Sequence, residues 1–498
     1  MSLAILHSRA LAGLDAPAVS IEVHVANGLP AFTLVGLAET AVKESRDRVR
    51  AALINSQFEF PPRRLTVNLA PADLPKDGSR FDLAIAVGLL AATGQLRRPA
   101  LDSYEFLGEL SLSGALRPVP GALPAALKAR DTGRTLILPR ENAREAARVR
   151  DVHLLPATHL TEVSAHLTGV APLSPWTEAP PPLAPRDTPD LADVRGQHRA
   201  RRALEIAAAG AHNLLMIGPP GSGKSMLASR LPGILPPMTE TEALEAAALA
   251  SISTQGFCED DWGQRPFRAP HHSASPAALI GGGSIPRPGE VSLAHQGVLF
   301  LDELPEFDRR VLEVLREPLE TGQITISRAA RQADFPARFM LVAAMNPSPS
   351  GLDEDSPAAR RYRERLSAPL LDRIDLHVEV PRVPAEALRA DETATGEPSA
   401  AVAARVAQAR KRMLDRAGRA NAALDVAQIR AHCLLSPGDA RLLETAMEKL
   451  ALSARARDRI LKVARTIADL AGSETIATAH LSEAITYRSL DRLNPRPV

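Results

Sequence analysis

Residues 214–225 read LLMIGPPGSGKS, and this stretch decides the fold of the region around it. Its first four residues form a short apolar run, which is typical of a strand buried in a parallel sheet. The next eight fit the spacing G-x-x-x-x-G-K-[ST], a loop that presents backbone N–H groups to phosphate. A helical pattern follows over 226–230. The strand, loop and helix together predict a nucleotide-binding α/β core.

The candidate phosphate-binding loop consists of Gly218, Pro219, Pro220, Gly221, Ser222, Gly223, Lys224 and Ser225. Its glycines allow the backbone to approach the phosphates closely. The lysine of such a motif reaches the β- and γ-phosphates, and the final hydroxyl can ligate Mg²⁺. The N-terminus of the next helix adds its dipole. We therefore expect ATP and Mg²⁺ as ligands of this loop.

A second motif, VLFLDE at 298–303, is an apolar strand that ends in two acids. After a phosphate-binding loop, this pattern indicates that Asp302 holds the Mg²⁺ ion and that Glu303 orients the attacking water. The alternative is an ordinary acidic strand end at a turn. Together with the loop, the motif predicts ATP hydrolysis rather than ATP binding alone.

Two further candidates lie later in the chain. Asn346, after the apolar run 339–345, could position the lytic water, although the Asn-Pro sequence is also common in simple turns. Arg373 in LLDRID could be an arginine finger that reaches the nucleotide of a neighbouring subunit. Alternatively, it forms a surface salt bridge with Asp372 or Asp375.

The domain organisation follows from composition and periodicity. Seven prolines occur between 171 and 190, so this segment lacks many backbone donors and is expected to be an extended linker. We expect five segments: an α/β domain at 1–170, the linker at 171–190, the nucleotide-binding core at 191–383, a polar connector at 384–400 and a helical lid at 401–498.

Shorter patterns place elements within these domains. Alternating residues predict N-terminal strands at 20–25 and 64–69, a β-rich run lies at 135–138, and helices are expected at 39–56 and 81–93. In the core, apolar runs predict parallel strands at 214–217, 298–301, 340–343 and 376–380.

Whole-chain composition excludes several classes of protein. The 498 residues carry a formal charge of +1, so net charge gives no argument for or against nucleic acid. Two cysteines cannot form a disulfide scaffold and fit a reducing compartment. There is no run of 18 apolar residues, so no membrane span is expected. We expect a cytoplasmic protein without a membrane partner.

Several longer motifs carry a family resemblance. The core contains PFRAPHH at 266–272, GGG at 281–283 and PGEVSLAHQG at 288–297, which runs into LFLDELPEF. These resemble the magnesium-chelatase-like branch of the AAA+ ATPases. With the N-terminal stretches MSLAILHSRALAGLDAP and VNLAPADLPKDG, almost the whole chain resembles the ComM/YifB family.

The resemblance implies a Lon-protease-like N-terminal domain, a P-loop AAA+ core with a parallel sheet, and a small helical lid. It further implies a homo-hexameric DNA motor, similar to ATP-dependent helicases that promote branch migration when single-stranded DNA is integrated during natural transformation. Single-stranded and branched DNA, and the recombination machinery, would then be the partners. A chelatase motor or a chaperone-like protein remodeller stays as the alternative, because the ATPase motifs would look the same.

The resemblance also assigns residues outside the loop. Arg455 in the lid is similar to a sensor-2 arginine, with Arg457 and Arg459 as rivals. The segment ITISRAAR at 324–331 looks like the presensor-1 hairpin of minichromosome-maintenance helicases. Arg328, with Arg331, would then contact the DNA backbone in a salt-dependent way. The alternative is that these arginines are solvated hairpin charges.

The chain departs from its relatives in two places. The Lon-type catalytic serine would fall at Arg80, with Ser79 one position early, and the lysine would fall near Ala125, three residues before Lys128. A serine–lysine dyad needs hydrogen-bond contact, so we predict an inactive peptidase domain.

The second departure follows Asn346, where many relatives have cysteine pairs and this chain has serines. Hydroxyls are poor zinc ligands, so we expect no structural zinc.

Two other features have plain interpretations from sequence. His271 and His272 are adjacent, their side chains are expected to diverge, and no acid or cysteine follows nearby, so we interpret them as part of a structural or DNA-facing loop. The polar segment 259–263 is expected to face solvent.

Overall fold

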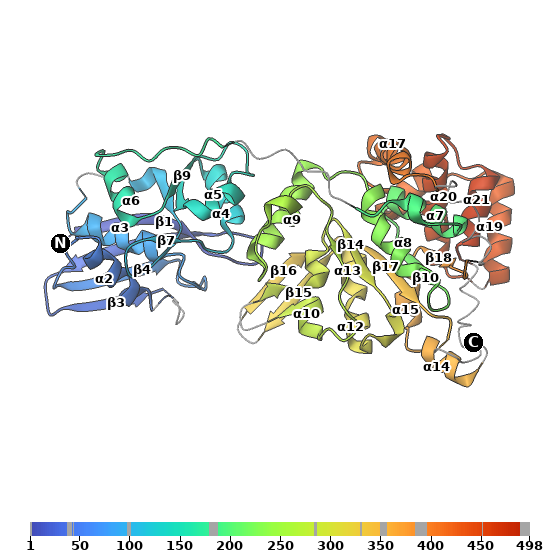
Figure 1. Ribbon diagram of the computed structural model, residues 1–498, viewed down its shortest axis with the longest axis horizontal. Coiled ribbons are helices and arrows are strands. Elements are labelled where there is room, and N and C mark those ends of the chain that lie inside the picture. The colour runs from blue at the N-terminus through green and yellow to red at the C-terminus, as the bar shows by residue number, and fades with distance from the viewer. Residues whose placement is uncertain are drawn as a thin grey trace. The chain divides into compact units, whose positions relative to one another are not determined.

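The structure is a computed structural model that describes residues 2–36, 42, 44–96, 101–178, 188–282, 286–328, 331–348, 356–383, 396–450 and 452–488. The chain divides into two compact units (Figure 1). The N-terminal unit comprises Met1–Ala184 together with Leu244–Trp262, and the core unit comprises Pro185–Ala243 with Gly263–Val498. One segment of the chain therefore leaves the core unit, joins the N-terminal unit and returns.

A seven-stranded mixed sheet forms the N-terminal unit, in the order β3-β4-β2-β1-β5-β8-β9. Strands β1, β2 and β4 pair antiparallel, and the remaining pairs are parallel. Burial alternates along β2 and β4, as expected for strands with one face on the core. The strands are β1 (Ser2–Arg9), β2 (Ala18–Ala26), β3 (Ala31–Val35), β4 (Arg64–Ala70), β5 (Tyr104–Phe106), β8 (Thr135–Pro139) and β9 (Leu154–Ala157).

Helix α3 (Asp82–Ala92) fills the centre of this unit, because nearly all of its residues are apolar and buried. Gly88 permits its close approach to the sheet, since an added methyl would lie 2.6 Å from the Val23 Cγ2 atom. Across the sheet, the Arg9 Nε atom of β1 donates to Glu105 of β5 over 2.7 Å. The other helices are α2 (Ser45–Asn55), α4 (Ala122–Thr132), α5 (Arg140–Ala146) and α6 (Leu160–Leu167).

Helix α9 (Glu240–Ile252) begins in the core unit and ends in the N-terminal unit. Ala247 and Ala248 are buried in one apolar cluster with Leu123 and Ala126 of α4. The backbone N–H of Gly121, at the start of α4, donates to the Ser251 carbonyl over 3.1 Å. This helix end is therefore an integral part of the N-terminal core.

The segment after α9 is fastened to the same unit. The Arg148 Nη2 atom donates to Glu259 over 3.1 Å, and the Arg148 guanidinium lies 5.1 Å from the centre of the Trp262 ring. The expectation that 259–263 simply faces solvent is therefore wrong. Glu259 and Trp262 contact Arg148, which lies more than a hundred residues earlier in the chain. The polarity of the segment alone cannot indicate such a contact.

The core unit is built on a five-stranded sheet in the order β11-β14-β17-β10-β18, in which every pair is parallel. The strands are β11 (Phe267–Arg268), β14 (Val298–Leu301), β17 (Met340–Met345), β10 (Leu214–Ile217) and β18 (Leu376–Glu379). The prediction of a parallel sheet from the four apolar runs is confirmed. A separate antiparallel hairpin joins β15 (Gln323–Arg328) to β16 (Arg331–Pro336).

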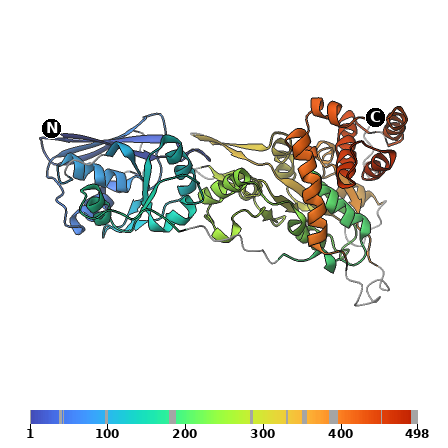
Figure 2. The ribbon, with the colours of Figure 1, turned by 90° about the horizontal axis from the view of Figure 1, so that it is seen from above.

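Helices follow the sheet towards the C-terminus, as the sequence predicts. They are α17 (Ser399–Ala417), α18 (Val426–His432), α19 (Pro437–Leu450), α20 (Ala454–Leu470) and α21 (Thr478–Thr486). Figure 2 shows α17 crossing the region of α7 (His198–Gly210), and both contribute to one apolar cluster with the sheet. The helical lid and the sheet thus share a core. Among the described residues, no helix is long and apolar enough to span a membrane.

Both tryptophans of the chain, Trp176 and Trp262, pack against the cluster that contains Ala248. Replacing Ala248 by Asp would bury a carboxylate there, which costs several kcal/mol in an apolar site. We expect Ala248→Asp to shift tryptophan emission to longer wavelength and to lower the midpoint of the fluorescence-monitored thermal transition. The exposed Thr241→Asp on the same helix is the control and should keep both values. Wild-type emission and midpoint in Ala248→Asp would contradict the packing of this segment.

Candidate functional site

The candidate site lies at the carboxyl edge of the core sheet. Parallel strands end at the same edge, so the loops that follow β10, β14 and β17 meet there. The phosphate-binding loop follows β10, Asp302 and Glu303 follow β14, and Asn346 follows β17. Residues from three distant segments are thereby brought together.

Lys224 occupies the centre of this arrangement. Its Nζ atom donates to the carbonyls of Gly218 over 2.7 Å and Pro219 over 3.0 Å, and to the Asn346 Oδ1 atom over 3.1 Å. Burial lowers the pKa of Lys224, and the Asp302 and Glu303 carboxylates oppose that shift. The structure therefore links the loop directly to Asn346.

The loop is shaped by close backbone contacts. A methyl group added at Gly218 would lie 2.1 Å from the Val380 carbonyl oxygen, so no side chain fits there. Gly221 and Gly223 have φ values of 73° and 93°, a region that other residues rarely adopt. The Gln197 side chain donates to the Ser222 carbonyl over 3.2 Å, which ties the loop to the segment before α7.

The loop residues fit a nucleotide and a divalent cation. The Ser225 hydroxyl donates to the Asp302 Oδ2 atom over 2.5 Å, so two oxygen ligands of the kind Mg²⁺ prefers lie side by side. The Ser222 hydroxyl is buried and has no hydrogen-bond partner among the described residues. Among the described residues, the Lys224 ammonium donates to three neutral oxygens, which phosphate oxygens can replace.

Glu303 has a partner that the sequence did not suggest. The His272 Nδ1 atom lies 3.2 Å from the Glu303 Oε2 atom. The rings of His271 and His272 lie side by side at a tilt of 34°, with centroids 4.1 Å apart, instead of diverging. The expectation that the two side chains diverge is therefore wrong, and an acid far along the sequence lies beside His272. The interpretation of the pair as part of a structural or DNA-facing loop stays a prediction. The available signal was strand order, since β11 precedes the pair and adjoins β14, which precedes Glu303.

Arg373 is held within its own chain. Its Nη2 atom pairs with Glu320, at the end of α13 (Arg316–Thr321), and its Nη1 atom donates to the Pro369 carbonyl over 2.6 Å. Burial lowers the pKa of Arg373. The salt bridge considered from sequence is therefore present, but its acid is Glu320, which the sequence did not suggest. The role as an arginine finger stays a prediction, and it requires the Glu320 contact to open.

The three lid arginines have different surroundings at the start of α20. Arg455 is exposed, and Arg457 is exposed beside Asp458 at 3.5 Å. Arg459 pairs with Asp375, just before β18, and also donates to the Arg373 carbonyl over 3.2 Å. Among these arginines, Arg459 is the one that fastens the lid to the sheet. The assignment of Arg455 as the sensor-2 residue stays a prediction.

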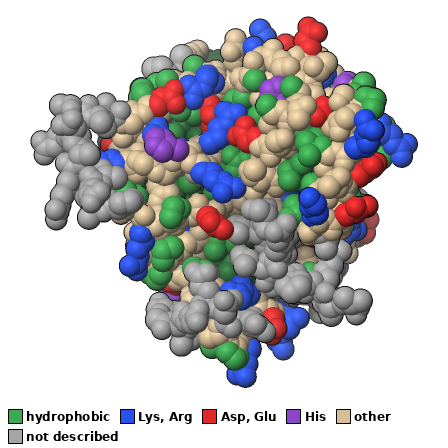
Figure 3. Space-filling view, turned by 90° about the vertical axis from the view of Figure 1, so that its right-hand side faces the viewer, with side chains coloured by type: hydrophobic (Ala, Val, Ile, Leu, Met, Phe, Trp, Pro, Cys, Tyr) green, Lys and Arg blue, Asp and Glu red, His purple; other side chains and the backbone are tan. Residues whose placement is uncertain are grey.

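Arg328 and Arg331 end the two strands of the hairpin. They are register partners in the β15–β16 ladder and flank its two-residue tip, Ala329-Ala330, which lies outside the described residues. The structure thus has the hairpin expected from sequence, and both arginines lie at the same end of it. On the face shown in Figure 3, by contrast, basic and acidic side chains are interspersed.

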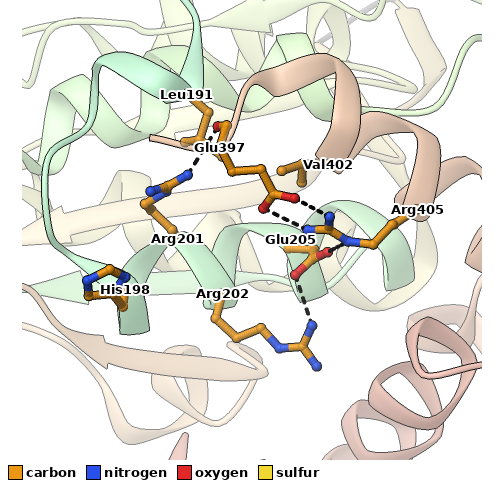
Figure 4. A pocket seen from close by; sticks show the side chains of 8 residues that line it. All are labelled: Leu191, His198, Arg201, Arg202, Glu205, Glu397, Val402 and Arg405. Atoms are coloured by element: carbon orange, nitrogen blue, oxygen red, sulfur yellow. Dashed lines mark hydrogen bonds and ion pairs between the residues drawn. The ribbon is translucent and has the colours of Figure 1, made fainter. Parts of the chain in front are cut away.

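A pocket of about 270 Å³ lies between α7 and α17 (Figure 4). No residue of the phosphate-binding loop lines it. The Arg405 Nε atom donates to Glu205 over 2.8 Å, and the same guanidinium pairs with Glu397. The Arg202 Nη1 atom donates to Glu205 over 2.9 Å. Arg202 and Arg405 of the pocket are therefore paired with its two glutamates, and the network fastens α17 to α7.

Ser79 and Lys128, the residues nearest to the positions of a Lon-type dyad, have different partners in the N-terminal unit. The Ser79 hydroxyl donates to Glu109, whereas the Lys128 ammonium lies 3.0 Å from Asp15. Arg80 is buried, its Nη2 atom donates to the Pro120 carbonyl over 2.7 Å, and burial lowers its pKa to about 10. A serine–lysine dyad requires direct contact, and these two side chains have other partners.

Among the described residues, no group of three or more His, Cys, Asp or Glu side chains is arranged to hold a metal ion. Residues 349–355 lie outside that set, so the expected absence of zinc after Asn346 stays a prediction.

Asp375 joins the sheet to the lid. It accepts from the Asn213 backbone N–H over 3.0 Å and lies 3.4 Å from His212 Nδ1, in addition to its pair with Arg459. Burial alone raises the pKa of this carboxyl, but Arg459 and His212 outweigh burial, so the pKa lies well below its usual range. A depressed folded-state pKa stabilises the fold above about pH 4, and the contribution is lost as pH falls below that value.

Asp375→Asn should therefore lower the calorimetric stability of the core unit at pH 7 by about 3–5 kcal/mol, since Arg459 loses its charged partner. Between about pH 4 and pH 2 the variant should lose less further stability than the wild type. Asp415→Asn, at an exposed position of α17, is the comparison and should behave like the wild type. Equal pH profiles for Asp375→Asn and the wild type would refute the linkage.

Comparison with known proteins covers most of the chain. Residues 190–388 match the family "Magnesium chelatase, subunit ChlI", residues 21–142 match "Subunit ChlI of Mg-chelatase", and residues 396–488 match its C-terminal part. The competence protein ComM of Haemophilus influenzae is 54% identical, over 99% of both chains. The YifB protein of Salmonella typhimurium is 52% identical, over 99% of this chain and 98% of its own.

A more distant relative is the magnesium-chelatase 38 kDa subunit of Rhodobacter capsulatus, at 24% identity over 61% of this chain and 88% of its own. The chain therefore has a magnesium-chelatase-type AAA ATPase domain. Because the similarity to the competence protein extends from end to end, the chain belongs to the ComM/YifB family.

Proposed function

We propose that this protein is an ATP-hydrolysing DNA motor that assembles as a homo-hexamer and promotes branch migration while single-stranded DNA is integrated into a chromosome. The observation that carries the proposal is the convergence of Lys224, Ser225, Asp302, Glu303 and Asn346 at one edge of the sheet. The 54% identical relative is named for competence, which supports a role with incoming DNA.

Hydrolysis follows from the roles these residues can take. Bound Mg²⁺ would neutralise charge on the phosphates, and Ser225 and Asp302 are its candidate ligands. Lys224 balances negative charge on the transferring phosphoryl group, because its ammonium is buried among neutral oxygens. Glu303 accepts the proton of the attacking water, and Asn346 helps to orient that water. Arg373 of a neighbouring subunit would complete the site once its pair with Glu320 opens.

The β15–β16 hairpin supports a DNA substrate. Its two terminal register partners are both arginines, and such a pair suits the phosphate backbone of DNA. Backbone contacts of this kind bind without reading sequence, as a translocating motor requires. The N-terminal unit, similar to Lon-type domains in the positions discussed above, would act as an assembly or DNA-contact platform and not as a peptidase.

Glu303→Gln should lower kcat for ATP by about 10²–10⁴-fold, since the amide cannot take the proton of water. ATP binding should stay within about twofold of the wild type, because Gln keeps the size of the side chain. Branch migration on a synthetic three- or four-strand junction, observed with the wild type and ATP, should be abolished in the variant. A wild type with ATPase stimulated by DNA but no migration would leave a translocase, and one indifferent to DNA would favour a protein remodeller.

Arg328→Ala should weaken binding to single-stranded DNA at every sequence tested and reduce the salt slope of binding by about one unit. DNA-stimulated ATPase should fall while ATPase without DNA is retained. Arg331→Ala should act in the same direction. Arg419→Ala, an exposed cation of the lid, is the control and should change neither quantity. If Arg328→Ala keeps the affinity and salt slope of the wild type, the hairpin is not the DNA contact.

A further inference from the structure

The N-terminal unit has an exposed apolar tip in the loop 27–30, which joins β2 to β3. Leu29 is 88% exposed, the largest exposed fraction of any large apolar side chain in the described part of the chain. Pro30, next to it, is exposed as well. A single exposed leucine is ordinary on a protein surface, so the groups around it decide whether it has a role.

The sheet topology places this loop across the start of β4. Ala26 at the end of β2 and Ala31 at the start of β3 are both register partners of Arg64. Because neighbouring strands lie roughly 4.8 Å apart, the loop must span about 10 Å over the end of β4. A methyl group added at Gly28 would lie 3.9 Å from the Arg64 Cβ atom. The Ala31 N–H donates to the Arg63 carbonyl over 3.3 Å, so the tip is fixed beside two arginines.

Cations lie on both faces of the sheet at this tip. Leu65 of β4 is buried in the apolar cluster that α2 and α3 share with the sheet. Since side chains alternate along a strand, Arg64 points to the opposite face. On the helical face, the Arg50 guanidinium of α2 lies 5.4 Å from the centre of the Phe60 ring. That ring stacks on Phe32 of β3, with centroids 6.3 Å apart, which supports the base of the tip.

The charge of the tip is not offset by acids in its own segments. Residues 23–38 and 60–72 contain no Asp or Glu. Within the described part of the chain, the Arg63 and Arg64 guanidinium groups are exposed and have no hydrogen-bond or ion-pair partner. Unpaired guanidinium groups suit phosphates, and an exposed apolar side chain between them suits the faces of unstacked bases. Both features of DNA occur together where two paired strands diverge.

We propose that loop 27–30 is a wedge that parts the strands of branched DNA. Leu29 packs against the bases at the branch point, and Arg50, Arg63 and Arg64 hold phosphates of the two strands that diverge on either side. The inference rests on the proposed function, because it assumes that the protein moves branched DNA. It assigns base-pair opening to the N-terminal unit, a step that backbone contacts at the β15–β16 hairpin do not provide.

Leu29→Ser removes the apolar tip at an exposed position. Branch migration on a synthetic four-strand junction should slow by about fivefold or more, since an apolar wedge offsets the cost of unstacking bases. Migration should fall more than ATPase does, so the ATP hydrolysed per junction resolved should rise. Leu112→Ser, at a leucine of the same unit that is 58% exposed, is the matched control and should keep the wild-type values of both rates.

A 2-aminopurine at the branch point of the junction reports base unstacking without turnover. With a non-hydrolysable ATP analogue, the wild type should raise its fluorescence and Leu29→Ser should not. Arg63→Ala and Arg64→Ala should each weaken binding of the junction and reduce the salt slope of binding by about one unit. Arg130→Ala is the control and should bind like the wild type, because Arg130 pairs with Asp131.

Wild-type migration and fluorescence in Leu29→Ser would overturn the inference. A changed assembly mass of Leu29→Ser in light scattering would also overturn it, because the tip would then be a contact between copies of the chain. A wild type that neither binds DNA nor responds to it in the ATPase assay would instead contradict the proposed function.

Discussion

Parallel hydrogen bonding between β10 and its neighbours is the constraint on which the site depends. Leu214 of β10 is in register with Val342 of β17 on one side and with Leu376 of β18 on the other. The three strands therefore end together, so the segments that follow them lie at the same edge of the sheet. Because the loop after β10 must pass within van der Waals contact of the Val380 carbonyl, glycine is required at 218. Backbone geometry, more than any single side chain, positions the phosphate-binding groups.

Features encoded in one contiguous stretch were predictable from sequence. The loop at 218–225 and the acids after β14 can be recognised from the spacing of their residues. The apolar runs locate the strands of the core sheet. Features that depend on strand order or on contacts between distant segments were not predicted from the sequence. His272 meets Glu303 only because β11 adjoins β14, and Arg373 meets Glu320 across 53 residues of sequence. Segment 259–263 looks solvent-exposed until Arg148 is brought beside it.

The lid is joined to the sheet by ion pairs and hydrogen bonds as well as by apolar packing. Asp375 accepts hydrogen bonds from the strand region through Asn213 and pairs with Arg459 of α20. On α7, Glu205 pairs with Arg202 of the same helix and with Arg405 of α17. Because the Asp375 and Glu205 carboxylates are buried, removing a cationic partner would leave a buried charge without its counter-ion, which is costly. A movement of the lid relative to the sheet must therefore break these pairs, or carry α7 and the segment before β18 along with it.

The membership of 244–262 in the N-terminal unit has a consequence for how the chain can be divided. A cut in the proline-rich stretch follows the domain boundary expected from sequence, yet a fragment that starts at residue 185 keeps this segment and loses the N-terminal residues that it packs against. Leu244, Ala247, Ala248, Phe257 and Trp262 would then form an uncovered apolar surface, which favours self-association. The complementary fragment, 1–184, would lack part of its own core. A fragment of the N-terminal unit should therefore carry 244–262 together with the residues that this segment packs against.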